Sequence, residues 1–471
     1  MTDTVETSSS VTNKIKQLFS NKVAQGIAGT MLMKMASAVI AFALFSLAAN
    51  ASGVEEFGRF SILFSVVSIL SIVAAAGQEL QVVRSWSEYL ANGRPGFAVG
   101  ALRYGWFVSS AGVVVISILL WVFFHTNTDW TPLTIKDKWP LGVAAIAFLA
   151  TNTLSLYSSH AARAIVGIKV GDAHYEITWR AIAIVFLTVC LLMGRAVDTT
   201  EILTVFAFGL VLVIVSQAYI VAREVKRQVG SVKPEYDLKE WTPRSVRLWL
   251  AAIMEASNQH MEVFLIGMLL DPVAAGAYFV AARLSNAFAL AASGLNTFGT
   301  RRVPGLYFAR DIPALKHTLN LMAGMSLIIV AGGLLCVIIG GEYMLMIFGR
   351  SYMDYYYVLL ILSIGTGLTA ANGPAPSFLM LTGHEGGYMK VVTASVLFRV
   401  MGFFLIVPYF GIIGAATVTA SVMVAMALLL NYYCRHFTGM DPSILRFILP
   451  STDVPPDGVE KTAPAVEEAV P

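Results

Sequence analysis

Charged residues are scarce in this sequence, and their scarcity decides its class. Only 13% of its 471 residues are Asp, Glu, Lys or Arg, whereas about a quarter of a soluble domain is charged. Hydrophobic residues make up 57% of the chain. This composition excludes an ordinary soluble protein and predicts an all-α integral membrane protein, because a helix satisfies its own backbone groups in lipid.

Motifs of common enzyme sites are also absent. The sequence has no GxxxxGK[ST], HExxH or GxSxG motif, so nothing predicts ATP hydrolysis, zinc chemistry or a serine nucleophile. Cys190, Cys336 and Cys434 lie in or beside apolar runs without metal-ligand spacing, and we interpret them as small buried hydrophobic residues. The longest outer loop, about His125 to Lys138, is too short for a catalytic domain. We predict no enzyme, no cofactor, no metal site and no nucleic-acid partner.

The two ends of the chain lack long apolar runs. Residues 1–24 are polar and have no short apolar core with a cleavage site, so no removable signal peptide is predicted. Residues 450–471 are rich in Pro, Asp and Glu and contain no aromatic residue. We expect this tail to be disordered, because it cannot bury enough apolar surface to fold.

Between these ends, about twelve apolar segments approach the roughly 20 residues that a helix needs to cross a bilayer. The first six lie at Gly26 to Ala49, Phe60 to Gly77, Leu102 to Phe124, Leu141 to His160, Ile177 to Met193 and Ile202 to Ala222. The other six lie at Leu248 to Leu270, Val273 to Leu295, Leu319 to Gly340, Tyr355 to Leu381, Val391 to Phe410 and Ile412 to Tyr433.

Lys and Arg are distributed unequally between the two sides of these spans. With the N-terminus inside, 24 of the 32 Lys and Arg residues fall on the cytoplasmic side, counting Arg180 there, and five fall on the outer side. Cytoplasmic segments of membrane proteins collect positive charge. The pattern therefore predicts that both ends of the chain are cytoplasmic.

An internal repeat relates the two groups of six spans. At an offset of 218 residues, Gly58-Arg59-Phe60 matches Gly276-Ala277-Tyr278, and the spacing from Gly58 to Arg84 recurs from Gly276 to Arg302. Six crossings are an even number, so both halves point the same way and the repeat axis runs along the membrane normal. The sequence predicts two six-helix lobes.

The repeat and the polar segments set the expected domain boundaries. Residues 1–24 form a cytoplasmic N-terminal segment, 25–222 and 248–434 form the lobes, and 435–471 form a cytoplasmic tail. The basic segment 223–247, which carries Trp241, is interpreted as a cytoplasmic linker that lies amphipathically on the membrane surface.

Three cations lie inside predicted spans. Counted from the span ends at 1.5 Å per residue, Lys34 and Arg399 lie about 12 Å deep and Arg283 about 15 Å deep. A cation near the bilayer centre costs roughly 2.5 to 3.5 kcal/mol, so each should face a partner, a cavity or a ligand. One interpretation pairs them with Glu255 and Glu262 for packing; because two carboxylates cannot neutralise three cations, the other is an anionic ligand.

Polar residues also mark the seventh and tenth spans. One face of the seventh span carries Glu255, Asn258 or Gln259, and Glu262. These side chains would line an interior path, couple transport to an ion, or only join helices by hydrogen bonds. Gly373, Pro374 and Pro376 predict a break in the tenth span, which would be either a hinge or a static kink.

Two short patterns carry a family resemblance. The run from Gly53 to Phe60 (GVEEFGRF) resembles the outer turn after the first helix of Wzx-type bacterial polysaccharide flippases, in the multidrug/oligosaccharidyl-lipid/polysaccharide exporter superfamily. Glu262 to Gly267, then Gly276-Ala277-Tyr278 and Ala281 to Leu284, are similar to the pattern around the eighth helix of that family. Glu262 stands where the family often has Asp. The resemblance covers roughly residues 20 to 440.

The resemblance implies a function. Members of the family have two bundles around a central cavity, work by alternating access driven by an ion gradient, and carry cations on the first and eighth helices, where Lys34 and Arg283 stand here. The expected partners are an undecaprenyl-pyrophosphate-linked oligosaccharide, membrane lipids, a polysaccharide polymerase and a chain-length regulator, in the bacterial inner membrane. The alternatives are a drug or cation exporter of the same superfamily and a membrane glycosyltransferase or polymerase.

Overall fold

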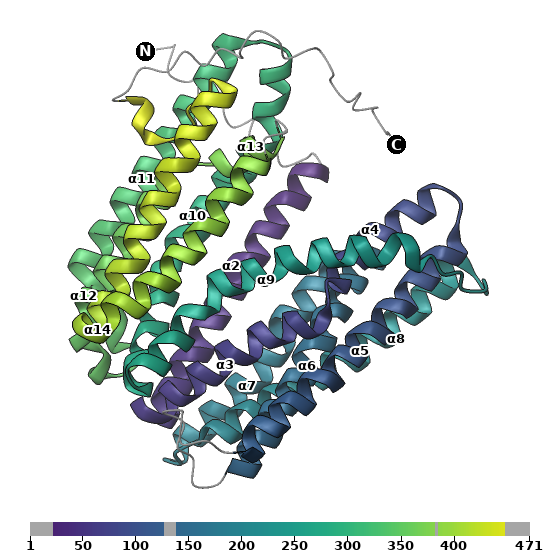
Figure 1. Cartoon of the computed structure of the whole chain (residues 1–471), viewed down its shortest axis with the longest axis horizontal. Coiled ribbons are helices and arrows are strands. Elements are labelled where there is room, and N and C mark those ends of the chain that lie inside the picture. The colour runs from purple at the N-terminus through teal and green to yellow at the C-terminus, as the bar shows by residue number, and fades with distance from the viewer. Residues whose placement is uncertain (1–21, 127–137, 382–384, 448–471) are drawn as a thin grey trace, which may run out of the picture.

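The computed structural model describes residues 22–126, 138–381 and 385–447 (Figure 1). Most of the predicted N-terminal segment, the longest outer loop and the tail from residue 448 lie outside this part of the chain. The side chain of Lys34 also lies outside it, although its backbone belongs to a described helix.

All regular structure in the described residues is helical. The first half of the chain forms α2 (Lys22–Ser52), α3 (Val54–Ala75), α4 (Gln78–Ala91), α5 (Pro95–Thr126), α6 (Lys138–Ile165), η1 (Lys169–Ala173), α7 (His174–Leu192) and α8 (Thr199–Val229). The second half forms α9 (Leu238–Leu269), α10 (Pro272–Phe308), α11 (Ile312–Met346), η2 (Arg350–Tyr355), α12 (Tyr356–Ala371), α13 (Ala375–Leu381), α14 (Glu385–Thr438) and η3 (Ile444–Phe447).

These helices account for the predicted number of membrane crossings. Nine of the described helices are long and apolar enough to cross a bilayer. The last of the nine, α14, contains two crossings, because Gly411 leaves the helical conformation with φ 59° and ψ −147°. The more polar helices α9 and α10, of 32 and 37 residues, supply the remaining two crossings.

Aspartate side chains begin four of the long helices. Asp198, Asp237, Asp271 and Asp311 each accept a hydrogen bond from the backbone N–H three residues later, at the first turns of α8, α9, α10 and α11. An N-terminal turn has N–H groups without helical partners, so a carboxylate there stabilises the helix by about 1 kcal/mol. These caps fix where the polar turns between spans end.

The two lobes meet where α3 packs against α10. We call this end outer, following the predicted orientation; in Figure 1 it lies at the lower left, and the lobes diverge from it toward the top. A methyl group added to Gly58 would lie 1.9 Å from the carbonyl oxygen of Pro272, and one added to Gly276 would lie 3.0 Å from the Cα of Gly58. Residues at equivalent places in the 218-residue repeat therefore touch, so the repeat axis passes between them.

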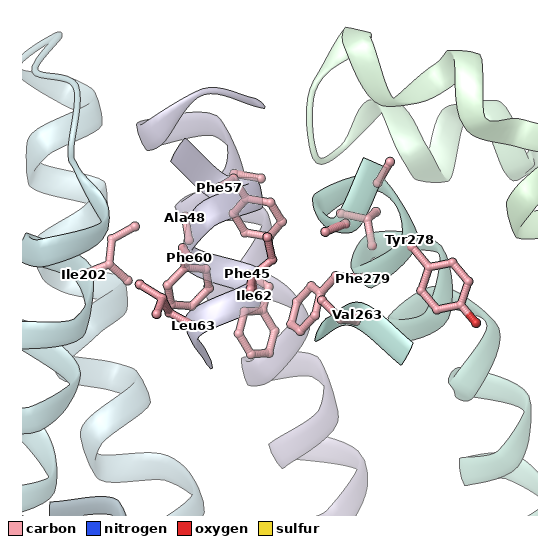
Figure 2. Close-up of a cluster of buried hydrophobic side chains, with 14 of the residues drawn as sticks. Phe45, Ala48, Phe57, Phe60, Ile62, Leu63, Ile202, Val263, Tyr278 and Phe279 are labelled. Carbon is pink, nitrogen blue, oxygen red and sulfur yellow. The ribbon is translucent and has the colours of Figure 1, made fainter. Parts of the chain in front are cut away.

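Aromatic rings fill the space beside this glycine contact. Figure 2 shows Phe279 of α10 lying beside Phe45 of α2 and Ile62 of α3. The ring of Phe279 is 5.0 Å from that of Phe45 and 5.9 Å from that of Phe57, and both pairs are edge-on. Phe42 of α2 packs in the same way on Phe348, with 5.0 Å between the ring centres. Edge-on pairs add about 0.5 to 1.5 kcal/mol each to the burial of the rings. These side chains seal the outer end of the contact between the lobes.

The interpretation of residues 223–247 as a surface-lying linker is wrong for its second half. Residues 223–229 continue α8, and residues 238–247 form the first turns of α9. Trp241 is completely buried, and its indole N–H donates to the hydroxyl of Tyr89 on α4 at 2.7 Å. The inner end of α9 therefore packs on the first lobe, because its aromatic residue finds an apolar pocket there instead of the membrane surface.

The glycine contact yields a test with a matched control. We expect Gly58→Ala to lower the thermal unfolding midpoint of the purified protein, because overpacking costs about 1 to 3 kcal/mol. Gly324→Ala, at a helix position with nothing within 4 Å, should leave the midpoint unchanged or raise it, because alanine favours a helix. Equal midpoints for the two variants in fluorescence-monitored melts would contradict the close approach of α3 and α10.

Candidate functional site

A cavity of about 340 Å³ lies between α2 and α10. Its lining is apolar except for two residues of α10, Arg283 and Asn286. The other lining residues are Ala38, Val39, Ala41, Phe42 and Phe45 of α2, together with Phe348. Because Phe42, Phe45 and Phe348 also belong to the aromatic contacts between the lobes, the outer seal forms one wall of the cavity.

Arg283 lies in this cavity without an ion pair to any described residue. Its guanidinium stacks over the ring of Phe279, at 4.8 Å, and over that of Phe45, at 5.4 Å. Cation–π contacts of this kind contribute about 0.5 to 2 kcal/mol but leave the positive charge uncompensated. An anion entering the cavity would therefore meet a fixed donor in an apolar surrounding, where charge-assisted hydrogen bonds are strong.

A second arginine lies near the cavity, although the charge pattern in the sequence did not predict it there. Arg180 was expected among the cytoplasmic charges, yet it lies within the candidate span Lys169–Leu192, close enough to Arg283 for the two charges to repel. Arg180 is ion-paired with Glu176, one turn earlier on α7. It also donates to the hydroxyl of Ser37 on α2 at 2.9 Å. The predicted span Ile177 to Met193 already contained position 180, and Glu176, four residues earlier, is its ion-pair partner.

Arg399 lies in a buried network on the other side of α9. Its guanidinium is 2.8 Å from the carboxylate of Glu262, and only 4% and 13% of the two side chains are exposed. It also donates to the side-chain oxygen of Asn258 at 2.7 Å. The hydroxyl of Tyr278 donates to the other oxygen of Glu262 at 2.6 Å. The packing pair that the sequence left open is therefore the arrangement observed for Arg399.

The polar face of α9 divides into two parts. Asn258 and Glu262 turn toward Arg399, whereas Gln259 donates to Glu255 at 2.8 Å on an exposed part of the helix. Whether either carboxylate couples transport to an ion remains a prediction.

The predicted break in the tenth span lies between α12 and α13. Gly373 has φ 64°, in the left-handed region, and Pro374 ends the turn before α13 begins at Ala375. A methyl group added to Gly373 would lie 2.5 Å from the carbonyl oxygen of Pro442, so the segment before η3 packs directly on the break. The hinge role of Gly373, Pro374 and Pro376 remains a prediction.

Lys34 lies on α2, one helical turn before Ala38, which lines the cavity. Residues four apart share a helix face. Position 34 therefore belongs to the α2 face that lines the cavity.

Comparison with known proteins places the fold. No protein-family model matches the sequence, and no curated protein matches it. Among solved structures, an inward-facing multidrug resistance MATE family transporter of the MOP superfamily matches with TM-score 0.66 and 12% identity, over 86% of this chain and 97% of that one. This chain has the MOP-superfamily transporter fold. The predicted class, about twelve membrane helices in two lobes, is thereby confirmed.

Two further solved structures also match this fold. The lipid II flippase MurJ, in an inward closed conformation, matches with TM-score 0.59 and 13% identity over 85% of this chain and 86% of its own. An outward-facing MATE family transporter matches with TM-score 0.57 and 14% identity over 87% and 94%. The TM-score is higher for the inward-facing MATE structure than for the outward-facing one.

The buried ion pair gives a stability prediction. We expect Arg399→Gln and Glu262→Gln each to destabilise the protein by about 3 to 5 kcal/mol, because each leaves one buried charge uncompensated. The double variant should recover most of the loss. Arg227→Gln, which removes an exposed partner of Glu224, should cost no more than about 1 kcal/mol in the same unfolding measurements. Single variants at residues 262 and 399 that are as stable as Arg227→Gln would contradict a buried pair.

Proposed function

We propose that this protein is a transporter that flips a pyrophosphate-linked polyprenyl oligosaccharide from the cytoplasmic to the outer leaflet of a bacterial inner membrane, by alternating access. The observation that carries the proposal is Arg283, which lies in the cavity between the lobes and pairs with no carboxylate of the described residues. Moving a pyrophosphate through hydrocarbon without compensation costs several kcal/mol for each charge. A fixed guanidinium beside an apolar lining offsets that cost at the site where the head group would lie.

The residues that line the cavity support an amphiphilic substrate. Arg283 and Asn286 offer donors on α10, whereas α2 contributes five apolar residues. The sugar and pyrophosphate would occupy the space between the lobes while the polyprenyl chain stays in lipid. In this proposal Lys34, on the same face of α2, supplies the second cation.

Export of cationic drugs is the second candidate, since several proteins of this fold are MATE multidrug transporters. A carboxylate in the binding cavity would favour a cationic drug. None of the eight residues that line the cavity of this chain is acidic, and Arg283 would repel a cation. The lining therefore favours an anionic substrate.

Substitution of Arg283 tests the proposed binding role. We expect Arg283→Ala to bind undecaprenyl pyrophosphate about ten- to 100-fold more weakly, since charge-assisted hydrogen bonds contribute about 1.5 to 3 kcal/mol. Arg283→Lys should retain part of the affinity, because the charge is kept. Arg247→Ala, which removes an exposed arginine of α9, is the matched control and should bind normally. Binding would be measured with the protein in lipid nanodiscs.

The uncharged alcohol undecaprenol serves as the control ligand. We expect it to bind wild-type protein and Arg283→Ala alike. Wild-type affinity that is equal for the alcohol and the pyrophosphate, or unchanged pyrophosphate affinity in Arg283→Ala, would contradict the assignment.

The cellular substrate can be identified by what accumulates. In cells without the protein, the lipid-linked oligosaccharide should build up on the cytoplasmic face with its chemical structure unchanged. A covalently incomplete lipid-linked sugar would point instead to a glycosyltransferase or polymerase.

A further inference from the structure

Glu79 is a buried carboxylic acid that the proposed substrate site does not use. Only 4% of the residue is exposed, and its Oε2 atom has no hydrogen-bond partner. The one other carboxylic acid with comparable burial in the described residues, Asp441, faces Arg435 at 3.4 Å. Glu262, the buried carboxylate of α9, is paired with Arg399. Glu79 therefore differs from both in having no cation beside it.

Two buried apolar residues share the α4 face of Glu79. On α4 it precedes Val82 and Trp86 by about one and two turns, and these residues are 2% and 3% exposed in a hydrophobic cluster. An ionised carboxylate buried without a partner is strongly disfavoured and takes up a proton instead. Burial accordingly raises the pKa of the Glu79 carboxyl to about 7, against a smaller opposite contribution from its own backbone N–H.

The charged groups on the elements around α4 already have other partners or lie exposed. On α4 itself Arg84 pairs with Glu88, and on α9 Arg244 pairs with Glu88 and Glu240. On α6 Arg163 pairs with Asp172, and His160 bonds to the carbonyl oxygen of Leu156. On α5 Arg103 is exposed, and on α3 Arg59 pairs with Glu55 and Glu56 at the outer end.

Glu79 follows a sharp bend between α3 and α4. Ala76 and Gly77 have φ values of 52° and 73°, so two successive residues lie in the left-handed region, and for Ala76 this is strained. The bend packs on α9: a methyl group added to Gly77 would lie 2.5 Å from the carbonyl oxygen of Ser245. Gln78 donates to the hydroxyl of the same serine at 3.0 Å.

The same helix connects this bend to the second lobe. Trp249 of α9 donates its indole N–H to the carbonyl oxygen of Val73 at 3.0 Å, just before the bend. Farther along, α9 carries Glu262, which pairs with Arg399 of α14. Direct contacts therefore join the bend to α9, and an ion pair joins α9 to α14 of the other lobe.

We propose that Glu79 is a proton-binding site at the α3–α4 bend, and that its uptake and release of one proton are linked to the packing of this bend on α9. In the conformation described, the carboxylate binds one proton from water as the pH falls through about 7 and is then neutral. A rearrangement that opens the bend to water releases the proton. If the proposed transport function holds, this site lets a proton gradient drive the cycle.

Infrared difference spectroscopy of the full-length protein in nanodiscs, without substrate, tests the proton site independently of transport. Between about pH 5 and about pH 9, wild-type protein should lose the C=O stretch of one protonated carboxyl group with a midpoint near pH 7. Glu79→Gln should lack this transition. Glu224→Gln, which removes the half-buried carboxylate of α8 that pairs with Arg227, should retain it. A transition that persists in Glu79→Gln, or its absence from the wild type, would overturn the proposal.

Thermal stability provides a second readout on the same samples. A folded-state pKa above the unfolded value of 4.5 means that the folded chain holds a proton that the unfolded chain has lost. Relative to Glu79→Gln, wild-type stability should therefore fall as the pH rises from about 4.5 to about 7 and then level off. A constant difference across this range would contradict the site.

A conservative variant covers the case in which Glu79→Gln does not fold. Glu79→Asp keeps the carboxyl group but moves it by one methylene, so its C=O transition should remain with a shifted midpoint. An unshifted transition would assign the band to another residue and overturn the proposal. Folded Glu79→Gln should bind undecaprenyl pyrophosphate with the wild-type affinity. In transport assays, the increase in transport rate that a pH gradient causes should be at least tenfold smaller in Glu79→Gln than in the wild type.

Discussion

A guanidinium held between two lobes without a carboxylate is the constraint on which this structure depends. Arg283 keeps its place because Phe279 and Phe45 stack beneath it, and these rings meet because the backbones of α3 and α10 approach closely at Gly58. Small residues at a helix crossing allow such an approach in a membrane, where association depends on packing. The glycine contact, the aromatic seal and the cation thus form one connected arrangement, with the cavity on its inner side.

The charges within the membrane separate into two kinds. Arg399 is ion-paired with Glu262, and Arg180 with Glu176. Each arginine also donates a hydrogen bond to a side chain of a neighbouring helix. Such pairs add little to the free energy of folding, but removing one partner of a buried pair strongly destabilises the protein. Arg283 stacks on two aromatic rings, pairs with no described carboxylate, and stays available to a ligand. This division explains why Arg283 and Arg399, both inside predicted spans, need not share one role.

Much of the fold could be predicted from the sequence, because span length, repeat offset and helix caps are local or periodic features. The 218-residue offset even identified Gly58 and Gly276 as equivalents, and the structure brings them into contact. Partners distant in sequence could not be predicted. The pairing of Arg399 with Asn258 joins residues 141 positions apart, and the burial of Trp241 depends on Tyr89. The burial of Glu79 could not be predicted either, because it depends on how α4 packs.

A structure of the protein with bound undecaprenyl pyrophosphate would test the central claim most directly. The account predicts that the pyrophosphate lies in the cavity between α2 and α10, with a phosphate oxygen within hydrogen-bond distance of the Arg283 guanidinium, and with the polyprenyl chain directed into lipid. A pyrophosphate bound elsewhere, with Arg283 unchanged over the rings of Phe45 and Phe279, would contradict it.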